Sequence, residues 1–236
     1  RLRGVLLDCE TSGAGKECHM LFLDLAKAYD SVEYWALDDA MRGLGVPEPV
    51  LKLLRALDDG AQARVLVGGA AHETGWVDLE RGAAQGEVMS PLRFIAWMNL
   101  LLEALDAEGV GYSYQGGAKP YPGQAYCDDG LFMAESQRDL QRSCDVISAF
   151  CEMYKVKINA GKSYYTVSYG ARNKAVAKNW VAHPQGQVEL WDHTHANTGA
   201  WLPVPQLPPD KVIRYLGVMV AADRSGAEQT AKVDRL

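Results

Sequence analysis

The sequence has few cysteines, no long apolar run and fewer basic than acidic side chains. Its five cysteines are odd in number and scattered, which argues against a disulfide framework and for a reducing, intracellular setting, nuclear or cytoplasmic. No apolar stretch approaches the roughly 18–20 residues of a membrane span, so we expect a soluble protein with no membrane partner.

Basic charge is the second shortage. The 236 residues carry 24 lysines and arginines against 30 aspartates and glutamates, a formal net charge of −6. A free-standing nucleic-acid binder is usually basic, so this balance counts against nucleic acid unless basic surfaces lie in other parts of the protein. It suits a site in which several carboxylates bind a metal ion.

A starting methionine and a signal-like segment are also missing, so we expect the chain to be a piece of a longer protein. What is present is ordinary for a globular protein with a sizeable core, at 48% hydrophobic and 23% charged residues. The length suits one large domain or two small ones.

Two adjacent carboxylates, Asp128 and Asp129, stand between short apolar runs, with Gly123 before them and Gly130 directly after. Apolar runs of this length bounded by glycine predict two strands joined by a tight turn, with the acids at its tip. Taken alone, the pair is explained most simply as an exposed turn, because aspartate is common in turns. The alternative is that the pair holds a cation.

A third acid, Asp24, lies in the apolar run 20–25, which predicts a buried strand. A lone acid in such a strand is costly unless it is paired or bound to metal. Lys27 is a simple salt-bridge partner on the first interpretation. On the second, adjacent strands of one sheet would bring Asp24 to the same edge as the Asp128–Asp129 pair.

The order of expected elements is typical of the α+β class, an antiparallel sheet with helices packed on one face. We expect Ser31 to cap one helix and Ser136 to cap another, and Cys144 and Cys151 to fill the core. In the helix over 92–105 we expect Ile95, Leu102 and Leu105 to point inward. The expected helices cover residues 32–41, 47–59, 92–105 and 137–154, and the expected strands cover 20–25, 63–67, 75–79, 123–134, 163–169 and 212–220.

Three gathered carboxylates cannot all ionise comfortably without cations between them. Hard oxygen ligands that are few and open to water suit Mg²⁺ ions that also hold substrate phosphates. A pair of such ions activates an attacking hydroxyl and stabilises the leaving oxygen of an in-line phosphoryl displacement. The acids therefore predict phosphoryl-transfer chemistry.

Five segments in order resemble the motifs of reverse transcriptases, of the kind found in non-LTR retrotransposons and group II introns. They are 22–32 (FLDLAKAYDSV), similar to motif A, 81–91 (RGAAQGEVMSP), similar to motif B, 126–129 (YCDD), similar to motif C, 159–162 (NAGK), similar to motif D, and 215–217 (YLG), similar to motif E.

The resemblance implies a polymerase palm, with a split βαβ, ferredoxin-like core, incomplete fingers and no thumb. Residues 1–20 would be a remnant of the fingers and 21–169 the palm with motifs A to D, including a fingers-side insertion at 46–80. Residues 170–211 would be an irregular insertion, and 212–236 the motif E strand pair with the start of a linker to the thumb.

The implied activity is that of an RNA-dependent DNA polymerase of a retroelement, using two Mg²⁺ ions, with Mn²⁺ as the alternative. Its partners would be an RNA template, a DNA or RNA primer, dNTPs and further domains of a longer polyprotein. An isolated palm is expected to fold and yet to polymerise poorly.

The resemblance also implies roles for single residues. Asp24 and Asp128 would ligate both metal ions, with Asp129 nearby and the backbone carbonyl of Leu25 assisting. Lys162 would lie by the triphosphate and stabilise or protonate the departing pyrophosphate, the alternative being a solvated surface lysine.

Tyr29 occupies the family's steric-gate position, where a bulky ring rejects a ribose 2′-OH, the alternative being a core aromatic. Gln85 and Gly86 would line the nucleotide and template site. Arg93 stands where the family has an apolar residue, so we expect its helix to be altered locally. Cys127 is expected to be a core residue beneath the turn.

Two other functions compete with this one. A reverse-transcriptase-like scaffold that binds RNA without catalysis has no physical need to gather three repelling acids and a lysine. A viral RNA-dependent RNA polymerase would be expected to have a small residue in place of Tyr29 and a glycine in place of Cys127, directly before Asp128.

Overall fold

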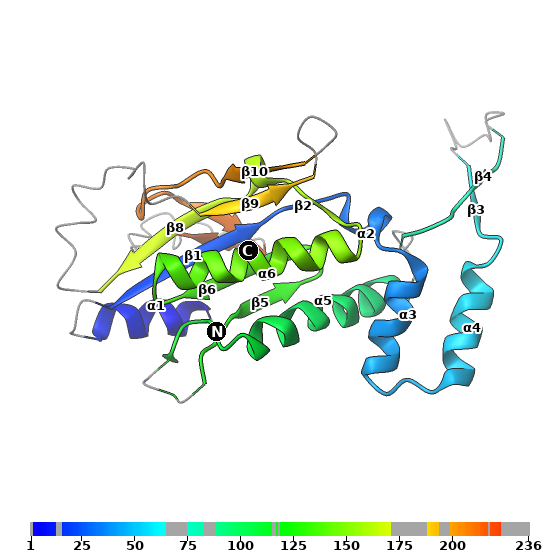
Figure 1. Cartoon of the computed structure of the whole chain (residues 1–236), viewed down its shortest axis with the longest axis horizontal. Coiled ribbons are helices and arrows are strands. Elements are labelled where there is room, and N and C mark those ends of the chain that lie inside the picture. Colours follow the sequence, from blue (N-terminus) through cyan, green and yellow to red (C-terminus); the bar gives the residue numbers. More distant parts are fainter. Residues whose placement is uncertain are drawn as a thin grey trace, which may run out of the picture.

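A four-stranded antiparallel sheet in the order β5-β6-β1-β8 forms the centre of the molecule (Figure 1). The computed structural model describes residues 2–12, 16–64, 75–82, 88–114, 117, 119–170, 188–193, 199–216 and 218–222. The sheet strands are β1 (Glu17–Leu23), β5 (Gly123–Tyr126), β6 (Asp129–Ala134) and β8 (Tyr164–Tyr169).

The middle strand β1 is buried on both faces. Leu21 and Leu23 belong to the larger hydrophobic cluster, whereas Met20 and Phe22 belong to the smaller one. Because side chains alternate along a strand, these two sets point to opposite faces of the sheet. Such a strand reads as one continuous apolar run, which is why the sequence predicts it as buried.

Helices cover both faces of this sheet. The larger cluster contains residues of α3 (Tyr34–Gly43), α5 (Ser90–Ala107) and α6 (Gln137–Met153). The smaller cluster on the other face contains α1 (Leu2–Thr11) and β11 (Ile213–Tyr215), which pairs with β12 (Val218–Val220). The α+β class is confirmed, while the expected restriction of helices to one face is wrong because α1 occupies the second.

The inward face of α5 is only in part the one expected, since Leu105 is buried and Leu102 packs against the larger cluster but Ile95 does not point inward. The side chains of Phe94, Trp97, Leu101 and Leu105 are buried, whereas Ile95, expected to point inward, is 40% exposed. The aromatic cluster decides this orientation, because Trp97 contacts Phe94, Phe150 and Tyr154.

Arg93 does not alter α5, which is continuous from Ser90 to Ala107, so that expectation is wrong. The Arg93 side chain is 1% exposed and donates two parallel hydrogen bonds, of 2.9 and 2.7 Å, to the two carboxylate oxygens of Asp58. Asp58 ends α4 (Glu48–Asp58), so the buried ion pair fastens α4 to α5.

Helices α3 and α4 and the short strands β3 (Gln62–Ala63) and β4 (Val77–Asp78) lie together at one end of the molecule, to the right in Figure 1. Ser31 does not cap α3. It ends the short helix α2 (Ala28–Ser31), and its hydroxyl donates to the Lys27 carbonyl at 2.8 Å.

Residues 170–211, expected to be irregular, contain a hairpin in their described part. Strand β9 (Glu189–Asp192) pairs with β10 (Ala200–Pro203), and Trp191 lies opposite Trp201. The hairpin packs beside α6 and β7 (Lys157–Ile158), and β7 pairs with β2 (Leu25–Ala26).

Two local predictions are confirmed. Ser136 caps α6 by accepting a hydrogen bond of 3.1 Å from the Asp139 backbone N–H. Cys144 and Cys151 are fully buried in the core.

No helix in the described ranges is both long and apolar enough to cross a membrane.

Candidate active site

The register between β1 and β6 places the predicted acids at one edge of the sheet. Leu23, the last residue of β1, lies opposite Gly130, so the next residue, Asp24, leaves the strand where β6 begins with Asp129. Asp128 lies in the turn that joins β5 to β6. The turn and the register therefore bring together side chains that are far apart in the sequence.

These carboxylates influence one another electrostatically. Burial raises the pKa of Asp24 above its usual value, the charge of Lys162 lowers it, and Asp128 and Asp129 raise it further. The pKa of Asp129 is raised first by burial and then by Asp128. Mutual repulsion of this kind is relieved when a cation lies between the acids.

The donor set fits an open metal site rather than a closed one. Asp128 and Asp129 are exposed to solvent, and Asp24 is half-buried. Within the described ranges, no three histidine, cysteine or acidic side chains gather closely enough to hold an ion by themselves. Mg²⁺ suits this arrangement, because it keeps several waters and is commonly held by one or two carboxylates plus substrate phosphates.

Asp24 is held in place through its backbone. Its N–H donates to Ser163 Oγ at 3.0 Å, and its carbonyl accepts from the Asn159 N–H at 3.0 Å. The Ser163 hydroxyl in turn donates to the Asn159 carbonyl at 3.0 Å, and Ser163 is fully buried. Leu25 pairs with Ile158 in the adjoining ladder. The segment 159–163 therefore positions Asp24.

Sequence reasoning missed Ser163. The one signal that could have found it is its position as a small polar residue between the NAGK segment and an apolar strand. We expect Ser163→Ala to lower the free energy of unfolding by about 1–3 kcal/mol, because the Asp24 N–H loses its acceptor, the hydroxyl of the buried Ser163. Chemical denaturation measures this. Ser113→Ala, at a half-buried loop serine, is the control and should change the value by less than about 0.5 kcal/mol.

Lys162 lies near Asp24 without forming an ion pair with it. It ends a short 3-10 turn (Ala160–Lys162), and its N–H donates to Asn159 Oδ1 at 3.1 Å. Its side chain is exposed. The ammonium group is therefore close enough to lower the pKa of Asp24 and open to an anionic ligand.

Tyr29 lies between α5 and the turn that carries Asp128. Its ring stacks on Phe94 with 4.6 Å between the ring centroids and 14° between the planes. Burial raises the pKa of its hydroxyl, as do the neighbouring Cys127 and Asp128. Phe94 is fully buried and was missed by sequence reasoning, because nothing in the sequence pairs residues so far apart.

Two further expectations concern this site. Cys127 is half-buried and packs against the larger cluster, with a left-handed backbone (φ 54°) that forms the turn, so it lies at the edge of the core. Gln85 and Gly86 lie outside the described residues.

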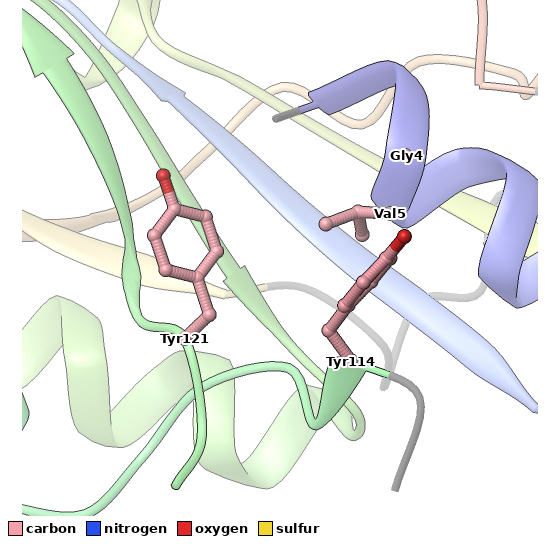
Figure 2. Close-up of a pocket in the computed structure, with 4 residues that line it drawn as sticks. All are labelled: Gly4, Val5, Tyr114 and Tyr121. Carbon is pink, nitrogen blue, oxygen red and sulfur yellow. The ribbon is translucent and has the colours of Figure 1, made fainter. Parts of the chain in front are cut away.

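A separate cavity of about 320 Å³ is lined by Gly4, Val5, Tyr114 and Tyr121 (Figure 2). Figure 2 shows the Tyr114 ring beside Val5 of α1, which covers the face of the sheet opposite α5 and α6. The four lining residues carry no charge. Since none of the described residues that line this cavity is an acid or a cation, the carboxylate edge is the stronger candidate for chemistry.

A family model described as "Reverse transcriptase (RNA-dependent DNA polymerase)" matches residues 3–220 of this chain. The chain is 28% identical over 156 residues to the "Retrovirus-related Pol polyprotein from type-2 retrotransposable element R2DM" of Drosophila melanogaster. It is 26% identical over 191 residues to the "Retrovirus-related Pol polyprotein from type-1 retrotransposable element R2" of Nasonia vitripennis.

A protein of the latter description from Popillia japonica is 26% identical over 148 residues. The matches cover 63%, 80% and 63% of this chain and 14%, 18% and 24% of the Drosophila, Nasonia and Popillia proteins. The chain therefore spans less than a quarter of the length of these relatives.

Proposed function

Since the chain belongs to the reverse transcriptase family, we propose that it is the palm of a retroelement's RNA-dependent DNA polymerase. The reaction is attack of a primer 3′-OH on the α-phosphate of a dNTP, directed by an RNA template. The observation that carries the proposal is the register of β1 and β6, which sets Asp24 beside the turn that holds Asp128 and Asp129.

We assign the acids as the ligands of two Mg²⁺ ions, with Mn²⁺ as the alternative. Asp24 and Asp128 hold the ions, Asp129 lies nearby and the Leu25 carbonyl assists. A divalent ion bound there supplies activation of the primer hydroxyl and neutralises charge at the reacting phosphate. The backbone hydrogen bonds of Asp24 with Ser163 and Asn159 fix one of these ligands before substrate arrives.

We assign Lys162 as the residue that supplies positive charge for the phosphates of the nucleotide. Its exposed ammonium group lies near Asp24 without an ion pair to it, so it is available to the phosphates of the incoming nucleotide. There it stabilises or protonates the departing pyrophosphate, since a positioned lysine is one of the side chains that can act as a general acid. Gln85 and Gly86 line the nucleotide and template site in this proposal.

The test is primer extension by the full-length protein on an RNA template, with Mg²⁺ and either dNTPs or rNTPs. DNA product from dNTPs supports the proposal. Extension from rNTPs in preference would favour an RNA-dependent RNA polymerase, and RNA binding without extension would favour a scaffold. The relatives' names describe Pol polyproteins, so we propose that further polyprotein domains are among the partners.

Tyr29 offers a test of sugar selection. Its stacking on Phe94 holds the ring rigidly, and a rigid ring beneath the sugar excludes a 2′-OH by its bulk. We expect Tyr29→Val to reduce the preference for dNTPs over rNTPs by about tenfold to a hundredfold, a difference of about 1.4–2.8 kcal/mol.

Single-nucleotide insertion kinetics measure the ratio of kcat/KM values. Tyr154→Val is the control, because Tyr154 is a partly buried ring that packs against Trp97 and Phe150 on the same core. Equal loss of discrimination between dNTPs and rNTPs in both variants would mean that Tyr29 is a core aromatic and not a steric gate.

A further inference from the structure

The β9–β10 hairpin is bonded to the Lys162 turn, which covers Ala160–Lys162. Both strands of the hairpin contact this turn. Asp192, the last residue of β9, accepts a hydrogen bond of 2.9 Å from the Ala160 backbone N–H through its Oδ2. Both residues are buried, so the Ala160 N–H depends on this carboxylate for its partner rather than on solvent.

The hairpin also holds the chain two residues earlier. The Ile158 N–H donates to His193 Nδ1 at 3.4 Å. Burial lowers the pKa of His193, so its ring is neutral at pH 7 and Nδ1 can accept this bond. Asn159, between Ile158 and Ala160, donates through its own N–H to the Asp24 carbonyl at 3.0 Å. The hairpin therefore binds the chain on both sides of the residue that contacts Asp24.

Helix α6, which lies beside β9 in Figure 1, fixes the hairpin in turn. The Gln141 side chain accepts a hydrogen bond of 2.8 Å from the Glu189 N–H and donates one of 3.1 Å to the Glu189 carbonyl. Further along β9, the Trp191 N–H donates to the hydroxyl of buried Ser148 at 3.1 Å. Strand β9 is therefore attached to a long helix on one side and to the Lys162 turn on the other.

A carboxylate is a costly side chain at the position of Asp192, which is 3% exposed. Taking a charge out of water is unfavourable unless hydrogen bonds compensate for the lost hydration. An apolar side chain would avoid this cost, but it would leave the Ala160 N–H without an acceptor. Because a hydrogen bond is directional and an apolar contact is not, the carboxylate fixes the orientation of the turn as well as its place.

We infer that Asp192 is a positioning residue that acts through Lys162, with the β9–β10 hairpin as its support. The inference rests on the proposed function, in which Lys162 serves the departing pyrophosphate. A 3-10 turn of three residues is short, so a shift of its first residue also shifts the lysine at its end. Asp24 has its own hydrogen bonds to Asn159 and Ser163. Loss of Asp192 therefore affects the lysine more than this carboxylate.

The first measurement is single-turnover primer extension by the full-length protein, on an RNA template with Mg²⁺ and saturating dNTPs. Asp192→Ala should slow extension by about tenfold to a hundredfold, because the lysine is kept but its geometry is no longer fixed. Asp192→Asn should stay within about threefold of the unaltered rate, since its side-chain carbonyl still accepts from the Ala160 N–H. An asparagine variant as slow as the alanine variant would contradict the hydrogen bond as the cause.

A double-mutant cycle tests whether Asp192 acts through Lys162. In a Lys162→Ala background, Asp192→Ala should slow extension by less than about threefold, because the side chain that it positions is gone. Asp38→Ala is the matched control: Asp38 is a buried acid that pairs with Arg55, and any loss that it causes should be equal in both backgrounds. Equal losses from Asp192→Ala in both backgrounds would overturn the inference, because a merely structural residue behaves in that way.

A second variant covers the case in which Asp192→Ala fails to fold. Gln141 is half-buried on α6, and Gln141→Ala loosens β9 without changing a buried charge. It should slow extension by a smaller factor than Asp192→Ala while Lys162 is present, and it should have no effect on the Lys162→Ala protein. A loss of rate that persists in the Lys162→Ala protein would contradict the inference.

Amide hydrogen exchange separates failure of this inference from failure of the proposed function. In the full-length protein without substrate, Asp192→Ala should speed exchange in the segment 158–163 and leave β1 unchanged, because the Ala160 N–H loses its acceptor. Unchanged exchange in that segment would overturn the inference at any level of activity. Faster exchange in a protein that extends no primer would contradict the polymerase assignment and leave the attachment of the turn to the hairpin standing.

Discussion

Replacing Asp128 by asparagine is expected to reduce primer extension on an RNA template by about a thousandfold. Asparagine keeps the shape of the turn and removes the charge that holds a cation. Metal ions contribute several kcal/mol to stabilising charge in a transition state, and about 4 kcal/mol corresponds to a thousandfold in rate. The rate of single-turnover extension measures the loss.

For stability, the expectation at the same site is the opposite: removing a carboxylate should not destabilise the fold. The pKa of Asp24 is raised in the folded protein, chiefly by burial and also by its acidic neighbours. A carboxyl group with a raised folded-state pKa stabilises the fold below its unfolded pKa, and this contribution is lost as the pH rises through the folded value. At pH 7 the ionised Asp24 therefore opposes folding.

Asp24→Asn should accordingly abolish extension while leaving the free energy of unfolding in EDTA unchanged or higher at pH 7. This combination separates a functional carboxylate from a structural one, whose loss would destabilise the fold. Asp210→Asn, at an exposed acid between β10 and β11, is the matched control and should extend primers normally. A destabilised Asp24→Asn protein, or an equally inactive control, would contradict the assignment.

Local features of this fold were predictable because they depend on neighbouring residues. The β5-β6 hairpin follows from glycine-bounded apolar runs, and the Ser136 cap follows from one serine and one acid three residues apart. The meeting of Asp24 with Asp128 depends on pairing between distant strands. Its prediction came from the expectation that the two strands are neighbours in one sheet, which neither segment shows alone.

The features that sequence reasoning missed all depend on contacts across long separations. Ser163 accepts a hydrogen bond from the Asp24 N–H, and the Phe94 ring stacks on Tyr29, although the sequence around neither residue indicates that role. The inward face of α5 is set by packing of Trp97 against rings of α6 and its end, which a helical period within α5 alone does not reveal. Tertiary packing decides between two faces that are both apolar.

Arg93 is the clearest case of a residue whose role depends on a distant contact. Its replacement by methionine should lower the free energy of unfolding by about 3–5 kcal/mol. The change leaves the Asp58 carboxylate without its bidentate partner and removes the distant pairing, at 3.9 Å, with buried Asp38. Removing one member of a buried ion pair is strongly destabilising because it strands the other charge. For a domain of this size the melting temperature should fall by about 10 °C.

A double variant separates the charge from the packing. Arg93→Met with Asp58→Leu removes both charges and should recover much of the loss, since apolar replacement of a whole buried pair is often neutral. Arg142→Met is the matched control: its pairing with Glu108 is exposed, so it should cost less than about 1 kcal/mol. A double variant as unstable as the sum of the single ones would contradict stranded charge as the cause. Because Phe94 adjoins Arg93 and stacks on Tyr29, the single variant should also weaken discrimination against rNTPs.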